Sequence, residues 1–321
     1  MNNIAAQSPS RQGAVIIDWI QHQGVYIAFG LLLLINLIFT PHFASMNSLI
    51  TQVIEVVPVL IVSLGMALVI GTEGIDLSVG AIMGLTSAVV SMSIGLGWLT
   101  AILISLVVGA LCGLFSGAVI AFTGVQPIIV TLGLLVGLRG LGQMLVGGQQ
   151  VKITNMIFLG LGQHKVLGVP EQTFIAVFCI AIIWFLLKRT TFGKYVIAIG
   201  SNRKASFLVG YPIRSTLLLV YIISGVLSAC AGVIETARVS FSDPSNIGLL
   251  MELNAITAVV VGGTPLTGGR IRLLGTIIGA LIMQLLDSTF IMNNLPNTWA
   301  EIMEAIIILL AVYIQRGRGS N

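Results

Sequence analysis

The chain has 321 residues, of which 56% are hydrophobic and only 8% are charged. Soluble domains have about 25% charged residues, so this composition excludes a soluble protein and leaves no room for a large soluble domain. The net charge of +4 does not indicate a nucleic-acid partner, because the basic residues collect between the apolar stretches. The apolar stretches are continuous, which predicts an all-α integral membrane protein rather than a barrel.

Residues 1–24 form a polar tail at the start of what we expect to be a single transmembrane domain, 1–321. This tail lacks the basic start, short apolar core and small-residue cleavage site of a signal peptide. We therefore expect the first apolar stretch to be a retained membrane helix.

Apolar stretches long enough for membrane helices follow one another along the chain. A spanning helix needs about 20 apolar residues. On this criterion about ten spans are predicted, near 25–39, 49–70, 77–94, 98–122, 126–146, 171–187, 216–235, 252–262, 271–291 and 299–315. The stretch 252–262 is too short to cross alone and is interpreted as a half-helix.

The basic residues predict the orientation, because cytoplasmic loops of membrane proteins are rich in Lys and Arg. The loop 188–215 holds six basic residues and no acidic residue. Arg270 and Arg272 mark a second cytoplasmic turn, and Arg316 and Arg318 mark the end of the chain. We expect both termini to be cytoplasmic and the loops 147–170 and 236–251 to lie outside.

A polar segment interrupts the apolar stretches at 71–80, with Thr72, Glu73, Asp76 and Ser78 among glycines. A charge at membrane depth costs at least about 2.5–3.5 kcal/mol on insertion scales, so it is rarely without function. Glycine permits irregular backbone, which persists in a membrane only where protein or a water-filled cavity covers it. The segment predicts a broken helix of a transporter; the alternative is an ordinary loop at the membrane surface.

Glycines recur at four-residue spacing within the predicted spans, which lets helix backbones approach closely in lipid. The spacing predicts helix-packing ridges at Gly109, Gly113 and Gly117, at Gly133 and Gly137, and at Gly275 and Gly279.

A second interruption follows at 262–270, where Thr264, Pro265 and Thr267 stand among glycines. Proline lacks an amide hydrogen and disfavours helix at the residue before it. An apolar run, a break and another apolar run thus occur twice. Paired broken helices in two repeat-like halves point to a transport site between the halves.

The sequence resembles the permease subunit of ABC-type monosaccharide importers, the ribose/xylose/galactofuranose-type family. Nearly the whole chain shares the family's motifs, which are Gly-Ile-Asp-Leu-Ser-Val-Gly at 74–80, Gln-Pro at 126–127, Thr-Leu at 131–132, Arg-Gly at 139–140, Ala-Ile-Gly-Ser-Asn at 198–202, Gly-Val-Ile-Glu at 232–235, Glu-Leu-Asn-Ala-Ile at 252–256 and Val-Gly-Gly-Thr at 261–264. The chain departs from the family at Glu73, where Gly or Ser is commoner, at Asn254, where Asp is commoner, and at Arg270 and Arg272 in a turn that is usually Gly-rich.

This resemblance implies a homodimeric or heterodimeric pore in a bacterial inner membrane. It implies a periplasmic or lipid-anchored sugar-binding protein and a separate cytoplasmic ATPase as partners. The chain itself carries no Gly-x-x-x-x-Gly-Lys-Ser/Thr phosphate cradle, which agrees with hydrolysis on another subunit. It also lacks a nucleophile–base pair or a metal-ligand cluster, so we expect neither an enzyme nor a cofactor.

The loop 188–215 resembles the element that docks on the ATPase. A helix N-cap is offered by Ser201 or Asn202, and Gly210 is a helix stop. The residues assigned to coupling are Gly200, Asn202, Lys204, Ala205 and Gly210. The alternative is that the basic residues only set topology or contact anionic lipid.

Glu235 and Arg238 are three residues apart at the outer end of a span and can share a helix face. They either hold the loop that receives the binding protein or form a surface ion pair of roughly 0–1 kcal/mol.

Further polar residues lie in or beside the spans and either line the sugar path or stabilise helix contacts, by roughly 0.6 kcal/mol each. With the residues of the two breaks, the candidates for the path are Glu73, Asp76, Ser78, Gln126, Arg139, Asn254, Thr264 and Thr267.

A competing hypothesis is an ion- or proton-coupled secondary transporter that uses Glu73 and Asp76 as coupling carboxylates. The family motifs instead favour Asp76 and Ser78 as helix-terminus caps beside the pore, because both side chains can satisfy exposed backbone amides. Glu73 is then the residue most peculiar to this chain.

Overall fold

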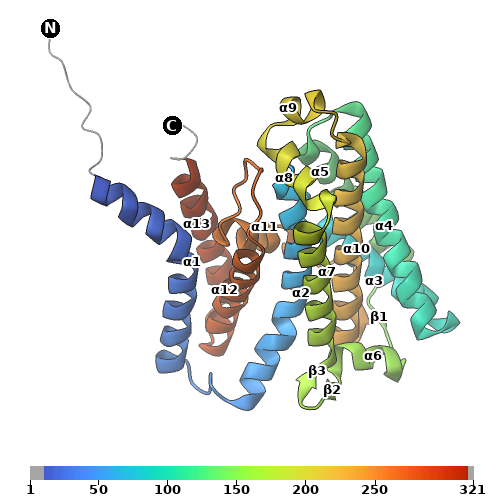
Figure 1. Ribbon diagram of the computed structural model, residues 1–321. Coiled ribbons are helices and arrows are strands. Elements are labelled where there is room, and N and C mark those ends of the chain that lie inside the picture. Colours follow the sequence, from blue (N-terminus) through green and yellow to red (C-terminus); the bar gives the residue numbers. More distant parts are fainter. Residues whose placement is uncertain (1–10, 317–321) are drawn as a thin grey trace, which may run out of the picture.

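The computed structural model describes residues 11–316 and is almost entirely helical (Figure 1). Seven of its helices are long and apolar enough to cross a membrane. They are α2 (Met46–Gly71), α3 (Val79–Ser93, prolonged by a 3₁₀ turn, Ile94–Leu96), α4 (Trp98–Thr123), α5 (Pro127–Leu145), α7 (Glu171–Arg189), α10 (Ile213–Val239) and α12 (Leu273–Met292). The helical membrane fold predicted from composition is thus observed.

The remaining predicted spans also coincide with helices, which are α1 (Arg11–Phe39), α11 (Met251–Val261) and α13 (Asn297–Arg316). Their lengths do not confirm a count of ten crossings. The apolar part of α1, Gly24–Phe39, is short, and α11 has 11 residues. At 1.5 Å per residue α11 extends about 16 Å, roughly half of a 30 Å hydrocarbon core, as expected for a half-helix.

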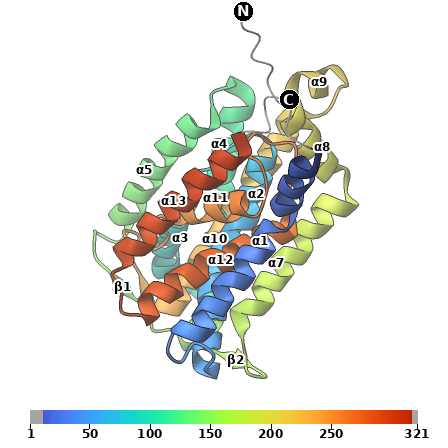
Figure 2. The same ribbon diagram turned by 90° about the vertical axis from the view of Figure 1, so that its left-hand side faces the viewer.

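Helix α2 forms the centre of the bundle. Its residues from Val56 to Gly71 are all buried. A helix that is apolar on every side must be covered on every side, and α2 is covered by α7, α10, α11 and α12. Figure 2 shows α1, α12 and α13 in front of it on one side of the molecule.

Helices α4 and α10 pack closely because glycines remove the side chains between them. A Cβ atom added to Gly109 would meet the backbone of Gly225, and one added to Gly113 would meet the carbonyl of Tyr221. Gly275 and Gly279 bring α12 equally close to α11 at Gly262 and Ala258. These two predicted ridges are helix contacts within the chain.

The third predicted ridge does not form a contact within the chain. Gly133 and Gly137 have open space where a Cβ would be, and most of α5 is exposed. The four-residue spacing of glycines on one helix therefore could not show whether the partner helix belongs to the same chain.

The short elements mark the two ends of the bundle. At one end β1 (Val151–Lys152) pairs with β4 (Phe241–Ser242), near α6 (Met156–Gln163) and the hairpin of β2 (Lys165–Val166) and β3 (Val169–Pro170). At the other end lie α8 (Thr191–Ser201) and α9 (Arg203–Leu208), together with the start of α1 and the end of α13 (Figure 1). The loops 147–170 and 236–251 thus share one end, as predicted, although this arrangement does not itself say which end faces the cytoplasm.

We predict that Gly113→Leu destabilises the protein, because its side chain would force α4 away from the backbone of α10. Overpacking of this kind costs about 1–3 kcal/mol. Thermal unfolding of the detergent-solubilised protein measures the effect. Gly30→Leu on α1 is the control, because nothing lies near its Cβ position. Equal melting temperatures for the two variants would contradict this account of the α4–α10 contact.

Candidate functional site

The first break, residues 72–78, joins α2 to α3 and is organised around Asp76. The Asp76 carboxylate is 1% exposed. Its Oδ1 accepts hydrogen bonds from the amide (3.0 Å) and the hydroxyl (2.6 Å) of Ser78. Its Oδ2 accepts one from the hydroxyl of Ser224 on α10 (2.9 Å). Asp76 therefore fastens the break to α10, and Ser78 donates to Asp76 where a capping bond to the helix backbone had been expected.

A second bond connects the same break to α5. The hydroxyl of Thr131 on α5 donates to the carbonyl of Ile75 over 3.2 Å. The break is thus bonded to two neighbouring helices, to α10 through the Asp76 side chain and to α5 through its own backbone. Such bonds within the protein are what irregular backbone needs in a membrane.

Glu73 has a left-handed backbone conformation, with φ +65°. This conformation is strained for residues other than glycine, by about 1–3 kcal/mol. The Glu73 side chain is exposed. A glycine at this position would be free of the strain, whereas this chain carries a strained residue with a carboxylate there.

The two breaks contact each other and the end of α8. The amide of Gly269 donates to the carbonyl of Gly71 over 3.1 Å. A Cβ at Gly200 would overlap both of these backbones, and a Cβ at Gly268 would press on the backbone of Glu73. We call this contact of Gly71, Gly200, Gly268 and Gly269 the glycine junction. The sequence pointed to each segment separately but did not indicate that they meet.

Within the second break, Thr264 is buried and its hydroxyl accepts a hydrogen bond from the amide of Arg272 over 3.0 Å. Asn254 is half-buried on α11, whereas Thr267 is exposed. Gln126 is the N-cap residue of α5, and its side chain is exposed. Of these candidates, Asp76, Ser78 and Thr264 are buried in the two breaks. Glu73, Gln126 and Thr267 are exposed at the surface of the single chain.

Arg139 on α5 holds the loop after β4. Its guanidinium donates to the carbonyls of Pro244 (2.9 Å), Ile247 (2.9 Å) and Gly248 (3.1 Å). The sequence interpretation left open whether Arg139 lines the transport path or stabilises helix contacts, and it did not identify the loop that Arg139 holds. The only indication of this role in the sequence was the presence of an arginine within an apolar stretch.

The same loop contains Asp243, whose partial burial acts to raise the pKa of its carboxyl. Hydrogen bonds from Asn246, Gln150 and the amide of Ser245 outweigh that effect, and the pKa lies below its ordinary value. The loop is thus held by Arg139 from the side of the bundle and by Asp243 from within.

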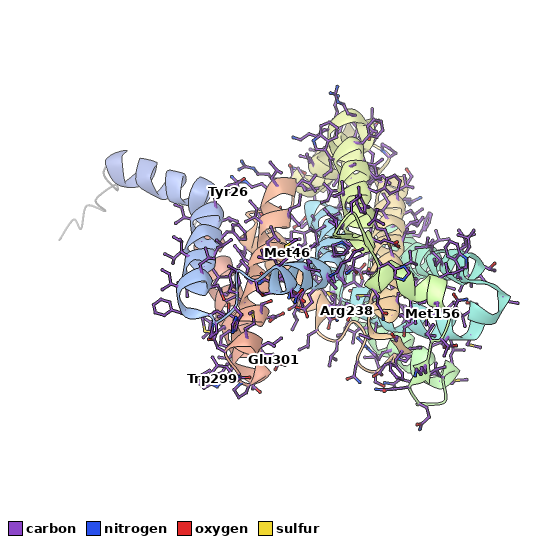
Figure 3. The ribbon with its side chains drawn as sticks, turned by 90° about the horizontal axis from the view of Figure 1, so that it is seen from below. Tyr26, Met46, Met156, Arg238, Trp299 and Glu301 are labelled. Carbon is purple, nitrogen blue, oxygen red and sulfur yellow. The ribbon has the colours of Figure 1, made fainter. Side chains whose placement is uncertain are left out.

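Glu235 and Arg238 form the expected pair on α10, with Arg238 Nε 3.0 Å from Glu235 Oε2. Arg238 also reaches Glu55 on α2 at 3.8 Å, and Gln284 on α12 donates to Glu55 over 2.8 Å. Figure 3 shows Arg238 at the end of the bundle seen from below. Three helices are therefore linked here. Sequence reasoning missed Glu55, although a lone acid inside a predicted span was a usable signal.

The predicted coupling loop forms two helices rather than one. Asn202 separates them and is the N-cap of α9, where its side chain accepts a hydrogen bond from the amide of Ala205 over 2.9 Å. Gly210 follows α9 with φ +81°. Lys204 and Ala205 are exposed on α9. Asn202 and Gly210 thus have the capping and stopping positions that the sequence predicted.

Among the side chains that the structure describes, no cluster of His, Cys, Asp or Glu is arranged to hold a metal ion.

A family model described as the permease component of a branched-chain amino acid transport system matches residues 48–312. The chain is 34% identical to the galactofuranose transporter permease protein YtfT of Escherichia coli, over 91% of this chain and 89% of that protein. It is 35% identical to the ribose import permease protein RbsC of Escherichia coli, over 92% and 94%. It is 30% identical to the L-arabinose ABC transporter permease protein AraH of Azospirillum brasilense, over 98% and 93%. No solved structure matches the chain.

A bundle of membrane-length helices with two glycine-rich breaks defines a multi-pass membrane permease. The chain belongs to the permease-component family whose model matches it from residue 48 to residue 312. The resemblance to sugar-importer permeases that the motifs indicated is confirmed by these relatives. As a permease component, the chain is a transport subunit and not an enzyme.

We predict that Asp76→Leu lowers the free energy of unfolding by about 1–3 kcal/mol, because the hydroxyls of Ser78 and Ser224 would lose their acceptor in a buried site. Asp76→Asn keeps an acceptor oxygen and should lose less. Thermal unfolding measures both. Equal losses for the two variants would show that the negative charge, which both remove, holds the break rather than hydrogen-bond acceptance.

We predict that Glu73→Gly raises the free energy of unfolding by about 1 kcal/mol, because relief of the left-handed strain outweighs the extra freedom of glycine in the unfolded chain. Glu73→Ala is the matched control, since it removes the carboxylate but keeps the Cβ. Only the glycine variant should be stabilised, as judged by thermal unfolding. If both variants are stabilised equally, the cause is removal of the Glu73 charge and not relief of backbone strain.

Proposed function

We propose that the chain is the membrane-spanning subunit of an ATP-driven monosaccharide importer, with its path beside the two breaks. The observation that carries the proposal is the glycine junction. It connects both breaks to α8, in the loop whose sequence resembles the ATPase-docking element. The relatives named for ribose, galactofuranose and L-arabinose support a sugar as cargo.

The proposed orientation places α8, α9 and both termini in the cytoplasm of a bacterial cell, with the inner membrane crossed about ten times. The six basic residues of 188–215 support it. In this orientation the end with β1, β4 and the Glu55–Arg238–Glu235 cluster faces the sugar-binding protein. The cluster would hold the outer ends of α2, α10 and α12 in place beneath that partner.

We further propose that the importer contains two permease copies, or this chain and a paralogue. The open ridge of Gly133 and Gly137 on α5 supports a helix contact outside the chain, because small residues allow close helix approach in lipid. Such a contact would place α5, which fastens the first break through Thr131, near the centre of a dimer.

The competing function is a secondary transporter coupled to ions through Glu73 and Asp76. The hydrogen bonds around Asp76 favour a holding role, since three donors of the protein already occupy its oxygens. Glu73 is exposed, and its conformation is explained by the turn.

Reconstitution of the permease with its ATP-binding subunit and sugar-binding protein tests the proposed function. In proteoliposomes, uptake of labelled monosaccharide should require ATP, and a proton gradient alone should give none. Vesicles that lack the ATP-binding subunit are the control. Uptake driven by the gradient without ATP would establish the competing function.

We predict that Ala205→Glu lowers sugar-stimulated ATP hydrolysis about tenfold or more, because a carboxylate would replace a methyl group at a docked surface. Insertion and folding should be unchanged, since Ala205 is exposed. Lys188→Gln, an exposed change at the other end of the same loop, is the control. Unaltered hydrolysis in the Ala205 variant would exclude α9 as the coupling element.

A further inference from the structure

A groove of about 1260 Å³ lies at the α8–α9 end of the molecule. Its walls are the end of α4, helix α9 and the start of α10, which lie close together in Figure 1. We call it the basic groove. Neither the transport path nor the glycine junction includes it.

Three cationic side chains line the basic groove. They are those of Arg203, Lys204 and Arg214. The stretch from residue 172 to residue 234, which supplies α9 and all of α10 before Glu235, contains no acidic residue, and neither does α4. The guanidinium of Arg214 lies over the ring of Phe122, 5.5 Å from its centre, in a cation–π arrangement. The charge of the groove therefore favours an anionic occupant.

Apolar side chains also line the basic groove, and several come from membrane-length helices. Ala121 and Phe122 come from the last turn of α4, and Leu218 lies more than one turn inside α10. Phe122 is 60% exposed and Phe207 on α9 is 73% exposed. The groove thus combines cationic side chains with exposed apolar ones at the ends of membrane-length helices.

We propose that the basic groove binds an anionic phospholipid. The phosphate lies among Arg203, Lys204 and Arg214, and the upper part of the acyl chains lies on Phe122 and Leu218. Basic pockets between membrane helices on the cytoplasmic side are suited to anionic lipid headgroups. A soluble ATPase could pair with the cationic side chains, but a phospholipid also matches the apolar lining that α4 and α10 supply. This proposal goes beyond the proposed transport function and does not depend on the cargo.

Bound lipid would brace α9 against α4 and α10. Lys204, which lines the groove, belongs to the proposed coupling loop. An anionic lipid would therefore hold this loop in position before the ATPase docks. Membranes with anionic lipid should therefore support stronger coupling than zwitterionic membranes.

Native mass spectrometry of the full-length permease with phosphatidylglycerol tests the proposal, with phosphatidylcholine as the neutral probe. A cation near an anionic lipid contributes about fivefold in affinity. The double variant Arg203→Gln/Arg214→Gln should therefore bind phosphatidylglycerol about 25-fold more weakly than the unmodified protein. The control is Lys152→Gln/Lys165→Gln, which removes the same charge at the opposite end and should keep the affinity.

Several outcomes would overturn the proposal. Equal losses of phosphatidylglycerol affinity in the groove and control variants would show that only the net charge of the protein matters. If phosphatidylcholine binds as tightly as phosphatidylglycerol, the groove recognises acyl chains and not the anionic headgroup. If soluble glycerol phosphate displaces the lipid, the groove is a site for free phosphate. If the groove variant keeps its lipid but loses affinity for the ATP-binding subunit, the groove is a protein-docking surface. Size-exclusion chromatography and circular dichroism establish that both variants are folded.

Discussion

The close contact of backbones at the glycine junction is the constraint on which the rest of the arrangement depends. The amide of Gly269 reaches the carbonyl of Gly71 only because Gly200 and Gly268 have no side chains to separate the three segments. In a membrane, irregular backbone must find its hydrogen bonds within the protein. The two breaks therefore meet part of this requirement by bonding to each other, and Gly200 of α8 lies against both of them.

Hydrogen bonds connect the first break to neighbouring helices of the bundle. Asp76 connects the break to α10 through Ser224, and Thr131 connects it to α5. At the other end of the bundle, Arg139 holds the loop after β4 and Arg238 connects α10 to α2. Polar side chains at both ends thus link helices whose middle sections pack through apolar residues and glycines. A permease that alternates between states can rearrange such links without exposing its apolar core.

The sequence predicted the features that depend on local chemistry. Apolar length identified the helices, Asn202 and Gly210 identified the limits of α9, and the paired spacing of Glu235 and Arg238 identified their ion pair. The features that depend on distant partners were not predictable. The role of Glu55 depends on the packing of α2 against α10, which brings Arg238 within reach. Arg139 donates to carbonyls more than 100 residues away in the chain. The glycine ridge on α5 shows the same limit, because its spacing could not reveal the absence of an internal partner.

The central claim is that α8 acts on both breaks through the glycine junction. Hydrogen–deuterium exchange of the purified permease carrying Gly200→Ala tests it most directly. The added methyl group would overlap the backbones of Gly71 and Gly269. We expect faster amide exchange in both 71–80 and 262–272, with the loop 243–250 at the opposite end of the bundle unchanged. Faster exchange confined to α8 and α9 would contradict the claim.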